Sequence, residues 1–359
     1  MARRIDGLFD GIADFTALLA ATQRAAASKR LQAEVAAFLA SQERHALRLA
    51  DALQAQTWQP GPYRSRMVQE PKARMISAAP FADRVVHHAL CAVIGPVFEQ
   101  GFIDDSFANR KGKGTHRAVA RYEHYRDRHA HVLRCDIWRY FPAIDHAVLK
   151  ADLARRLACQ KTLALCGRII DGSNPQEPVE LYFPGDDLFT PFGRRRGLPI
   201  GNLTSQWFGN IYLNPLDHFV KEVLRAPGYV RYVDDFALFH DDPAVLAAWR
   251  GRMQDFLARR RLVLHPRKTV IESTQVPAAF LGYVLHPSHR ALAPDNVARF
   301  KRRLQALRGR WRAGDIELPE VQRRVGAWLA HAGHAHTWRL RRTLFSGGMF
   351  EPLPGHAKR

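Results

Sequence analysis

The sequence predicts an α+β fold in which helices at both ends of the chain flank an antiparallel sheet. Apolar residues recur at helical spacing in the first 60 residues, as at Leu31, Val35 and Phe38, which indicates an amphipathic helix. The middle of the chain instead carries short runs of aromatic and β-branched residues, which favour strands. Two such runs lie on either side of Asp234 and Asp235, so we expect the pair at or near the tip of a β-hairpin.

The neighbours of this aspartate pair are unusual for a turn. Two-residue hairpin turns favour Gly or Asn, whereas Val233 and Phe236 flank the pair here. Two carboxylates in an apolar setting tend to take up a proton unless a counter-charge lies between them. The stretch therefore fits either a solvated acidic turn or a site for a divalent cation, and the second interpretation requires a third carboxylate elsewhere in the chain.

The charge of the chain points to a polyanionic partner. Its 359 residues include 54 Lys plus Arg against 34 Asp plus Glu, for a formal net charge of +20, and this surplus favours nucleic acid. We find no apolar run long enough to span a bilayer, no signal peptide and no lipidation motif, so we expect a cytoplasmic protein without a membrane partner. The cysteines show no Cys-x-x-Cys spacing and are expected to be reduced and mostly buried: Cys91, Cys135, Cys159 and Cys166.

Residues 1–60 are predicted to form a helical extension, because helix breakers follow at residues 60–62. The next stretch is predicted to be extended and contains Lys72 and Arg74, two residues apart. On a strand these side chains project from the same face, where two cations could hold a triphosphate. A solvated basic strand face is the alternative.

A helix predicted to begin at Pro80 belongs to the core, and a loop at residues 102–116 follows it. The loop combines aromatic residues, glycines and cations, among them Arg110. Glycines let a backbone approach phosphates closely, although two spaced glycines are a weak signal on their own.

A third carboxylate interrupts another predicted strand. An apolar run beginning at Val132 leads into Asp136, which breaks the strand pattern as Asp234 does. Asp145 is instead expected to cap a helix that begins near His146. Asp136 is therefore the residue that could complete a metal site with the aspartate pair.

Residues 171–196 are predicted to be a surface insertion or hairpin, because the segment is rich in Pro, Gly and Asp up to Phe192. It ends in three consecutive arginines at 194–196 and leads into a Gly-rich block at 197–206, before a predicted helix. Glycines at such a place suit close contact with a base pair or a phosphate. A plain loop and helix cap is the alternative.

Beyond the aspartate pair we predict a helix, a strand at residues 261–264 and a strand or hairpin arm at 280–285. The composition changes near residues 286–295, after which apolar residues at helical spacing define basic helices. A zinc site is conceivable at His331, His334 and His336. We favour a helix and turn instead, since no Cys or carboxylate lies near them in the sequence.

One aspartate on a strand and a downstream pair together fit two-metal phosphoryl transfer. In that chemistry one ion activates the attacking 3′-oxygen and the other neutralises the leaving pyrophosphate, so carboxylates must face both ions. Hard oxygen ligands suit two Mg²⁺ ions, with Mn²⁺ as an alternative. The residues therefore predict a polymerase. A non-enzymatic RNA-binding protein would explain the charge equally well but would not need the three aspartates.

In these blocks the chain resembles the reverse transcriptases. Residues 232–235 match the Tyr-x-Asp-Asp box of that family, and further blocks occur in the family's order between about residues 63 and 285. One box alone would be weak, but several blocks in order are a strong signal. The resemblance implies a right-hand polymerase, with fingers and an antiparallel palm sheet over residues 61–288 and a helical thumb over residues 289–359.

The resemblance also implies a role for each candidate residue. Lys268 would protonate the leaving pyrophosphate, and Phe141 would exclude the ribose 2′-hydroxyl. The metal ions would be held by Asp136, Asp234, Asp235 and the carbonyl of Ile137. The incoming dNTP would be bound by Lys72, Arg74, Arg110, Phe141, Ile200, Gly201 and Gln206. The RNA template and the cDNA/RNA duplex would be gripped through their phosphates by Arg194, Arg195, Arg196, Arg299, Arg302 and Arg303.

Departures from the family pattern indicate a subgroup. Most related enzymes carry Gln-Gly followed by Ser-Pro in the Gly-rich block, whereas this chain has Ile200 before Gly201 and Gln206 after Ser205. That pattern resembles the enzymes of diversity-generating retroelements, which copy a template RNA with errors at adenines; the resemblance also suggests a small basic accessory protein. Ile200 would remove an amide near the nascent base pair, so base selection would depend more on shape. A defence-associated or retron-like reverse transcriptase is the alternative.

Overall fold

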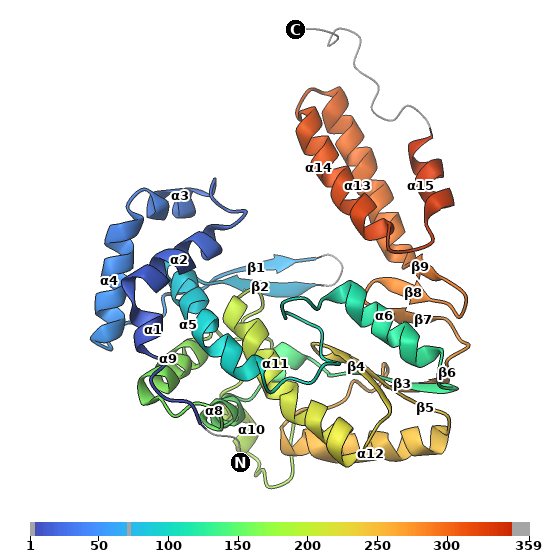
Figure 1. The fold of residues 1–359 in the computed structure, drawn as a ribbon, viewed down its shortest axis with the longest axis horizontal. Coiled ribbons are helices and arrows are strands. Elements are labelled where there is room, and N and C mark those ends of the chain that lie inside the picture. Colours follow the sequence, from blue (N-terminus) through green and yellow to red (C-terminus); the bar gives the residue numbers. More distant parts are fainter. Residues whose placement is uncertain (1–3, 70–72, 347–359) are drawn as a thin grey trace.

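The part of the chain that the structure describes combines helices with three antiparallel sheets, as predicted (Figure 1). The structure is a computed structural model and describes residues 4–69 and 73–346. Its first helices are α1 (Asp10–Ala13), α2 (Phe15–Ala26), α3 (Ala33–Leu39) and α4 (Gln42–Gln54). They pack against one another and against the long helix α5 (Phe81–Glu99). The N-terminal extension is thus helical.

One N-terminal prediction is wrong. Val35 and Phe38 are buried on α3, but Leu31 is fully exposed, with a relative accessibility of 101%. Helix α2 ends at Ala26, Ser28 adopts a positive φ of 61°, and the chain re-enters a helix only at residue 33. The apolar spacing therefore continued across a turn that the sequence pattern did not reveal.

The central sheet has the strand order β4-β5-β3-β6 and consists of β3 (His131–Asp136), β4 (Gly228–Tyr232), β5 (Asp235–His240) and β6 (Val270–Ser273). Both of its faces are covered. Phe236 and Leu238 of β5 belong to the main core with α12 (Pro243–Arg259), whereas Ala237 and Phe239 join a second core with α6 (Thr115–Arg126). Burial on both faces explains the unbroken apolar run of β5 from Phe236 to Phe239.

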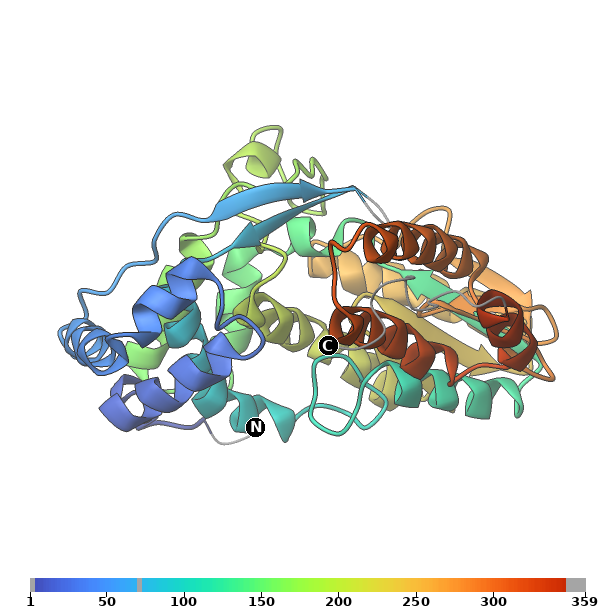
Figure 2. The ribbon, with the colours of Figure 1, turned by 90° about the horizontal axis from the view of Figure 1, so that it is seen from above.

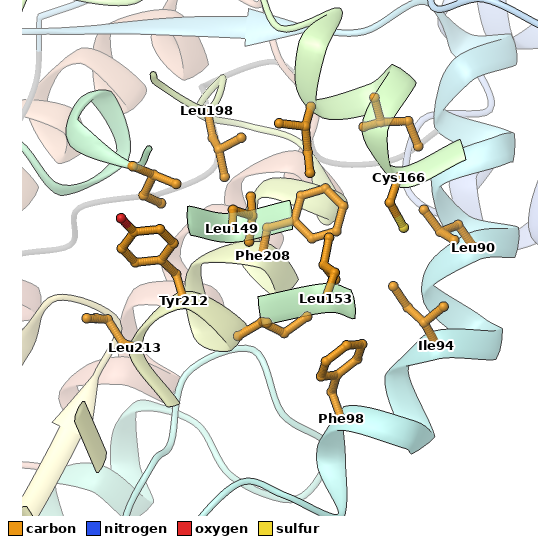
Figure 3. Close-up of a cluster of buried hydrophobic side chains, with 14 of the residues drawn as sticks. Leu90, Ile94, Phe98, Leu149, Leu153, Cys166, Leu198, Phe208, Tyr212 and Leu213 are labelled. Carbon is orange, nitrogen blue, oxygen red and sulfur yellow. The ribbon is translucent and has the colours of Figure 1, made fainter. Parts of the chain in front are cut away.

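The main core beside this sheet is helical. It is built from α5, α8 (His146–Ala154), α9 (Gln160–Asp171) and α11 (Leu203–His218). Leu90, Ile94 and Phe98 of α5 face Leu153 and Cys166 in Figure 3. All four cysteines are free and buried, as predicted. Among the described residues, α5 is long and apolar enough to cross a membrane, but 67% of that window is buried inside the protein, as expected of a core helix.

The connections differ from the predictions in one place. The remaining short elements are the hairpin β1 (Arg64–Val68) and β2 (Arg74–Ala78), the helices α7 (Tyr140–Ala143) and α10 (Thr190–Gly193), and a π-helical turn, η1 (Phe219–Val223). Of the two forms predicted for residues 171–196, insertion or hairpin, the structure has the first, a loop with the short α10. The strand predicted at 261–264 is wrong, because Arg261 has a φ of 60° and only Leu264 forms a bridge, with Ile137.

The C-terminal part begins with a small sheet of β7 (Ala278–Phe280), β8 (Tyr283–Leu285) and β9 (Arg290–Leu292). It is followed by α13 (Pro294–Arg312), α14 (Leu318–Ala332) and α15 (Trp338–Phe345), which project from the rest of the molecule (Figure 1). Seen from above, they lie at the end opposite the N-terminal helices (Figure 2). Phe300, Leu304 and Leu307 are buried on α13, which confirms the predicted apolar stripe.

Candidate active site

Two of the candidate aspartates lie opposite each other on neighbouring strands. The antiparallel register pairs Asp136, the last residue of β3, with Asp235, the first residue of β5. Tyr232 of β4 also pairs with Asp235, so Val233 and Asp234 form the two-residue turn of the β4–β5 hairpin. The predicted hairpin is confirmed, and its turn lies at the edge of the sheet where β3 ends. Like charges directly opposite each other on two strands are destabilising.

The turn itself is strained. Val233 has a φ of 59°, and Asp234 is not among the residues of positive φ. A positive φ at the first turn position alone is the pattern of a type II′ turn, where glycine is preferred. A β-branched residue in this region is an outlier, with a strain of about 1–3 kcal/mol that the surrounding structure must sustain.

Burial and neighbouring negative charge make Asp234 and Asp235 hard to ionise. Burial, followed by the charge of Asp136, raises the pKa of Asp234 to about 6. Burial, followed by the charges of Asp234 and Asp136, raises the pKa of Asp235 to about 7. The positive charge of Lys268 acts in the opposite direction on both pKa values, and Arg74 does so on that of Asp234. These cations do not cancel the effect, so both carboxyls hold a proton more readily than an exposed aspartate does.

Lys268 lies at this edge, where sequence reasoning placed it. Its Nζ is 2.5 Å from Oδ2 of Asp136, and the backbone N–H of His265 donates to the Asp136 carbonyl at 2.7 Å. The loop that carries Lys268 is therefore attached to Asp136 at two points. Contact with pyrophosphate stays a prediction.

The donor set fits hard divalent cations, because carboxylate oxygens are the ligands that Mg²⁺ prefers. As they stand, no three or more His, Cys, Asp or Glu side chains within residues 4–69 and 73–346 are arranged to hold a metal ion. Asp136 is instead held by Lys268, and the side chains would have to turn toward a shared ion. Such an ion would favour the ionised forms of Asp234 and Asp235, which their raised pKa values show to be disfavoured without it.

The three histidines of the zinc alternative are likewise not arranged to hold a metal ion in the described part of the chain. His331 is 3.0 Å from the hydroxyl of Tyr283 through Nδ1, and the ring of His334 stacks on His116 with centroids 3.5 Å apart. The backbone N–H of His336 donates to the Arg290 carbonyl. These histidines therefore pack at the junction between the C-terminal helices and the elements before them.

The Gly-rich block lies between Phe141 and the hairpin β1–β2. The N–H of Leu198 donates to the Phe141 carbonyl at 2.9 Å, and the N–H of Ser77 donates to the Ile200 carbonyl at 3.0 Å. Gly201 adopts a φ of 115°, and a Cβ there would lie 3.1 Å from a side chain of β2, so glycine permits this close approach. Three candidates for the nucleotide site, Phe141, Ile200 and Gly201, therefore lie close together.

The other candidates for the nucleotide site are less closely placed. Arg74 begins β2 and is exposed, and its charge acts on Asp234. Gln206 is exposed in the first turn of α11. Lys72 lies outside the described residues, so the predicted strand face that pairs it with Arg74 is not described.

Arg110 already has partners within the protein. Its guanidinium pairs with Glu99 at 2.7 Å and donates to the carbonyls of Ile103 and Ser106, both at 2.6 Å. The side chain is only 6% exposed. These bonds shape the loop before α6, and contact with a triphosphate would require them to break. The nucleotide role of Arg110 stays a prediction.

The predicted nucleic-acid residues fall into two groups. Arg194 pairs with Asp186 and donates to Leu181, and Arg196 donates to Pro191, whereas Arg195 is 63% exposed. The second group, Arg299, Arg302 and Arg303, lies on α13. A groove of about 710 Å³ between α13 and α14 combines apolar and basic side chains, among them Arg299, Phe300, Arg303, Leu304, Arg310, Arg324 and Trp328. Neither group has a described contact with the aspartates.

Sequence reasoning missed two buried residues near the site. Asn202 donates to the Ser77 carbonyl at 2.8 Å and accepts from the N–H of Ala79 at 3.2 Å, which fastens the Gly-rich block to β2. Arg231 is completely buried and donates to the carbonyl of Val233 at 3.0 Å. Arg231 carried a signal, because a charged residue stands there in an otherwise apolar strand.

Comparisons with known proteins give matches of different strength. Protein YkfC of Escherichia coli (strain K12) is 24% identical over 282 residues, which cover 66% of this chain and 70% of that protein. Telomerase from Candida albicans, solved in complex with a TWJ fragment of telomeric RNA, matches 70% of this chain and 52% of its own chain with 13% identity and a TM-score of 0.47; this likeness is too low to carry an argument. Residues 66–285 match the family described as "Reverse transcriptase (RNA-dependent DNA polymerase)". Because this match spans more than half of the chain, the chain belongs to the reverse transcriptase family of RNA-directed DNA polymerases, which are nucleotidyltransferases.

Proposed function

We propose that the chain synthesises cDNA on an RNA template by adding dNTPs to a primer 3′ end at Asp136, Asp234 and Asp235. The observation that carries this proposal is the register that sets Asp136 opposite Asp235, beside the turn that holds Asp234. The raised pKa values of Asp234 and Asp235 support it, because a bound cation would favour the ionised form that burial and neighbouring carboxylates disfavour. The family match supports the class of reaction.

The proposed chemistry needs cations that the aspartates would hold. Bound Mg²⁺ or Mn²⁺ would activate the primer 3′-hydroxyl for attack on the α-phosphorus and offset the charge of the leaving pyrophosphate. The Ile137 carbonyl would be a further ligand, and the Ile137 N–H donates to the Asp234 carbonyl at 3.2 Å. Lys268, 2.5 Å from Asp136, would be available to give a proton to pyrophosphate once cations take its place at the carboxylate.

Other residues would select and orient the substrates. Phe141 would exclude a ribose 2′-hydroxyl, and its ring lies beside Gly209 of α11, where a Cβ would be 3.4 Å from it. Arg74, together with Lys72, would bind the triphosphate. The basic helix α13 would grip the template–primer duplex through phosphates, so binding should weaken with salt. We also propose a cytoplasmic location.

Incorporation of dTTP on poly(rA)/oligo(dT) tests this function. The wild-type protein should extend the primer in the presence of Mg²⁺ or Mn²⁺, and Asp234→Asn should lower the rate by roughly a thousandfold or more, because a catalytic ligand is lost. Asp255→Asn is the matched control, since Asp255 is an exposed carboxylate on α12, and should leave the rate within about twofold. Equal incorporation by the wild type and Asp234→Asn would rule out this active site.

The Gly-rich block supports a narrower proposal. Ile200 is an apolar residue whose carbonyl accepts from Ser77 of β2, and with Gln206 it matches the pattern of the diversity-generating retroelement enzymes. We propose that the chain is such an enzyme, makes errors at template adenines and works with a small basic accessory protein. An amide at residue 200 could restore a polar check on the base pair, so Ile200→Gln should reduce adenine errors.

Sequencing of cDNA copied from a defined RNA tests the narrower proposal. The wild type should misincorporate mainly opposite adenine, and Ile200→Gln should shift this spectrum toward even errors. Adenine copied as faithfully as the other bases, or an unchanged spectrum in Ile200→Gln, would contradict the subgroup. Faithful copying would favour the alternative of a defence-associated or retron-like enzyme.

A further inference from the structure

A fully buried ion pair lies directly behind the catalytic turn. Arg231 of β4 and Asp217 of α11 are both 0% exposed. Nε and Nη2 of Arg231 donate to the two carboxylate oxygens of Asp217, each at 2.6 Å. Tyr229 lies two residues before Arg231, on the same face of the strand, and donates to the same carboxylate at 2.8 Å.

The remaining donors of Arg231 reach the turn and a neighbouring loop. Nη1 donates to the carbonyl of Val233 at 3.0 Å and to Oδ1 of Asn210 at 3.3 Å. Nη2 also donates to the hydroxyl of Ser106 at 3.0 Å. A guanidinium has five N–H groups in one plane, and all five have an acceptor here. Because the fork is rigid, fixing it on Asp217 also fixes the donor that points at the turn.

The loop before α6 is bound to the same strand through its backbone. The N–H of Arg231 donates to the Asp105 carbonyl, and the N–H of Phe107 donates to the Arg231 carbonyl, both at 2.9 Å. Asn210 also donates to the Ala108 carbonyl at 2.7 Å. Arg231 is therefore the point at which α11, this loop and the β4–β5 hairpin are joined.

Stability alone is a poor explanation for this arrangement. Removing two charges from water is costly, and apolar replacements of a buried ion pair are often neutral or stabilising. The turn, however, needs external support, because Val233 has a φ of 59° and strain of this kind persists only where the surroundings impose it. The bond from Arg231 to the Val233 carbonyl is such support. On the other side of the turn, the N–H of Ile137 holds the Asp234 carbonyl at 3.2 Å.

We propose that Arg231 is a positioning residue, which holds the Val233 carbonyl and thereby keeps the carboxylates of Asp234 and Asp235 where they can share a divalent cation. Asp217 acts through Arg231 by fixing the direction of its guanidinium. Neither residue touches the substrate. This inference rests on the proposed function, because it assumes that the aspartates bind the catalytic cations.

An apolar replacement of the network tests the proposal without leaving a buried charge behind. The triple variant Tyr229→Phe/Arg231→Met/Asp217→Leu replaces both charges of the ion pair and the hydroxyl that donates to it with apolar groups. Because no charge is left buried without its partner, the fold should survive. The matched control is Arg260→Met/Asp152→Leu. Arg260 and Asp152 form another buried ion pair, and the described hydrogen bonds of Arg260 go to Asp152 and to the Tyr212 carbonyl rather than to the turn.

The measurement is the affinity for Mn²⁺, followed by electron paramagnetic resonance of the free ion. The full chain is used with a dideoxy-terminated primer on an RNA template and dTTP, so that no turnover is needed. The triple variant should bind Mn²⁺ about 10–100-fold more weakly, as is typical when residues that orient metal ligands are lost. The Arg260 control should stay within about twofold of the wild type. Equal affinity in the triple variant and the control, with both folded, would overturn the proposal.

A rescue separates positioning from a merely structural role. Glycine adopts a positive φ without strain, so adding Val233→Gly to the triple variant should recover part of the lost Mn²⁺ affinity. No recovery would contradict the proposal. If the triple variant does not fold, Arg231→Lys replaces it, because lysine keeps the charge but lacks the fork. That variant should also bind Mn²⁺ at least about tenfold more weakly, and unchanged affinity in it would overturn the proposal.

The same assay distinguishes the two possible failures. Asp234→Asn must abolish specific Mn²⁺ binding if the proposed function is correct. Undiminished binding in Asp234→Asn would remove the proposed function itself. If Asp234→Asn loses Mn²⁺ binding while the Arg231 variants keep it in full, only the role proposed for Arg231 is refuted.

Discussion

Buried carboxylates in the core and carboxylates at the sheet edge differ in the counter-charge that the chain places beside them. In the core, Asp217 and Asp152 each lie against a guanidinium, from Arg231 and Arg260. At the sheet edge, Asp235 lies opposite another aspartate, and its pKa is raised to about 7 by burial and by neighbouring negative charge. The chain thus supplies its own counter-charge where a carboxylate serves the fold. At the edge Lys268 pairs with Asp136, and no such ion pair is described for Asp234 and Asp235, where a cation from solution could bind.

Asp235→Asn should produce the largest effect of these substitutions: it should lower activity and raise stability. Loss of a metal ligand should reduce dTTP incorporation by roughly a thousandfold or more. Removal of a repelled buried charge should raise the unfolding temperature in EDTA at pH 8 by a few degrees. Primer extension and thermal unfolding of the same preparations check both. A lower unfolding temperature in the variant would contradict the view that this charge is uncompensated.

Asp217→Asn should have the opposite effect on stability. It leaves the charge of Arg231 buried without its partner, so the free energy of unfolding should fall by about 3–5 kcal/mol. Urea unfolding of the wild type and the variant measures this difference. Asp255→Asn, at an exposed position, is the control and should change it by less than about 0.5 kcal/mol. A similarly small change at Asp217 would remove the distinction between the two kinds of carboxylate.

The pH dependence of stability should carry the signature of the raised pKa values. A carboxyl whose pKa is higher in the folded state stabilises the fold below the unfolded pKa, and this contribution is lost as pH rises through the folded pKa. For Asp234 and Asp235 the folded pKa values are about 6 and about 7. In EDTA, the excess unfolding temperature of Asp235→Asn over the wild type should therefore grow from pH 5 to pH 8. A constant difference across that range would show that the site does not titrate there.

Of these substitutions, Lys268→Met should have the smallest effect on stability, and it tests how far a cation of the chain itself acts on the two aspartates. The charge of Lys268 lowers the pKa of both Asp234 and Asp235, so its removal should move the loss of stability to a higher pH. Thermal unfolding in EDTA at closely spaced pH values would reveal the shift. An unchanged midpoint would mean that Lys268 interacts with Asp136 alone.

Much of the fold could be predicted because the signals were local. The strands on either side of Asp234 are almost wholly apolar, and the stripe of α13 repeats at helical spacing. Leu31 was misplaced because a turn at Ser28 interrupts the helix without a Gly or Pro to mark it. The strand predicted at 261–264 failed because its backbone is used instead to hold the chain after Asp136, as when Val263 accepts from Trp138.

The candidate site could be predicted only in part, for a related reason. Asp136 and Asp234 stand out as charges where apolar runs end, so the sequence identifies them individually. The partners of Arg231 lie on other elements, at Ser106, Asn210 and Asp217, and no local pattern joins them. The engagement of Arg110 with Glu99 was likewise invisible in the sequence. Tertiary contacts decide which buried charges are compensated.

The change in unfolding temperature on adding Mg²⁺ at pH 8 tests directly whether the aspartates at the sheet edge bind cations. An ion that binds only the folded state stabilises it in proportion to the logarithm of its concentration above the dissociation constant. The wild type should therefore gain stability as Mg²⁺ rises, whereas Asp234→Asn, already relieved of the charge, should gain little. An equal gain in the two proteins would contradict the claim that the uncompensated charge at this sheet edge is there to bind catalytic cations.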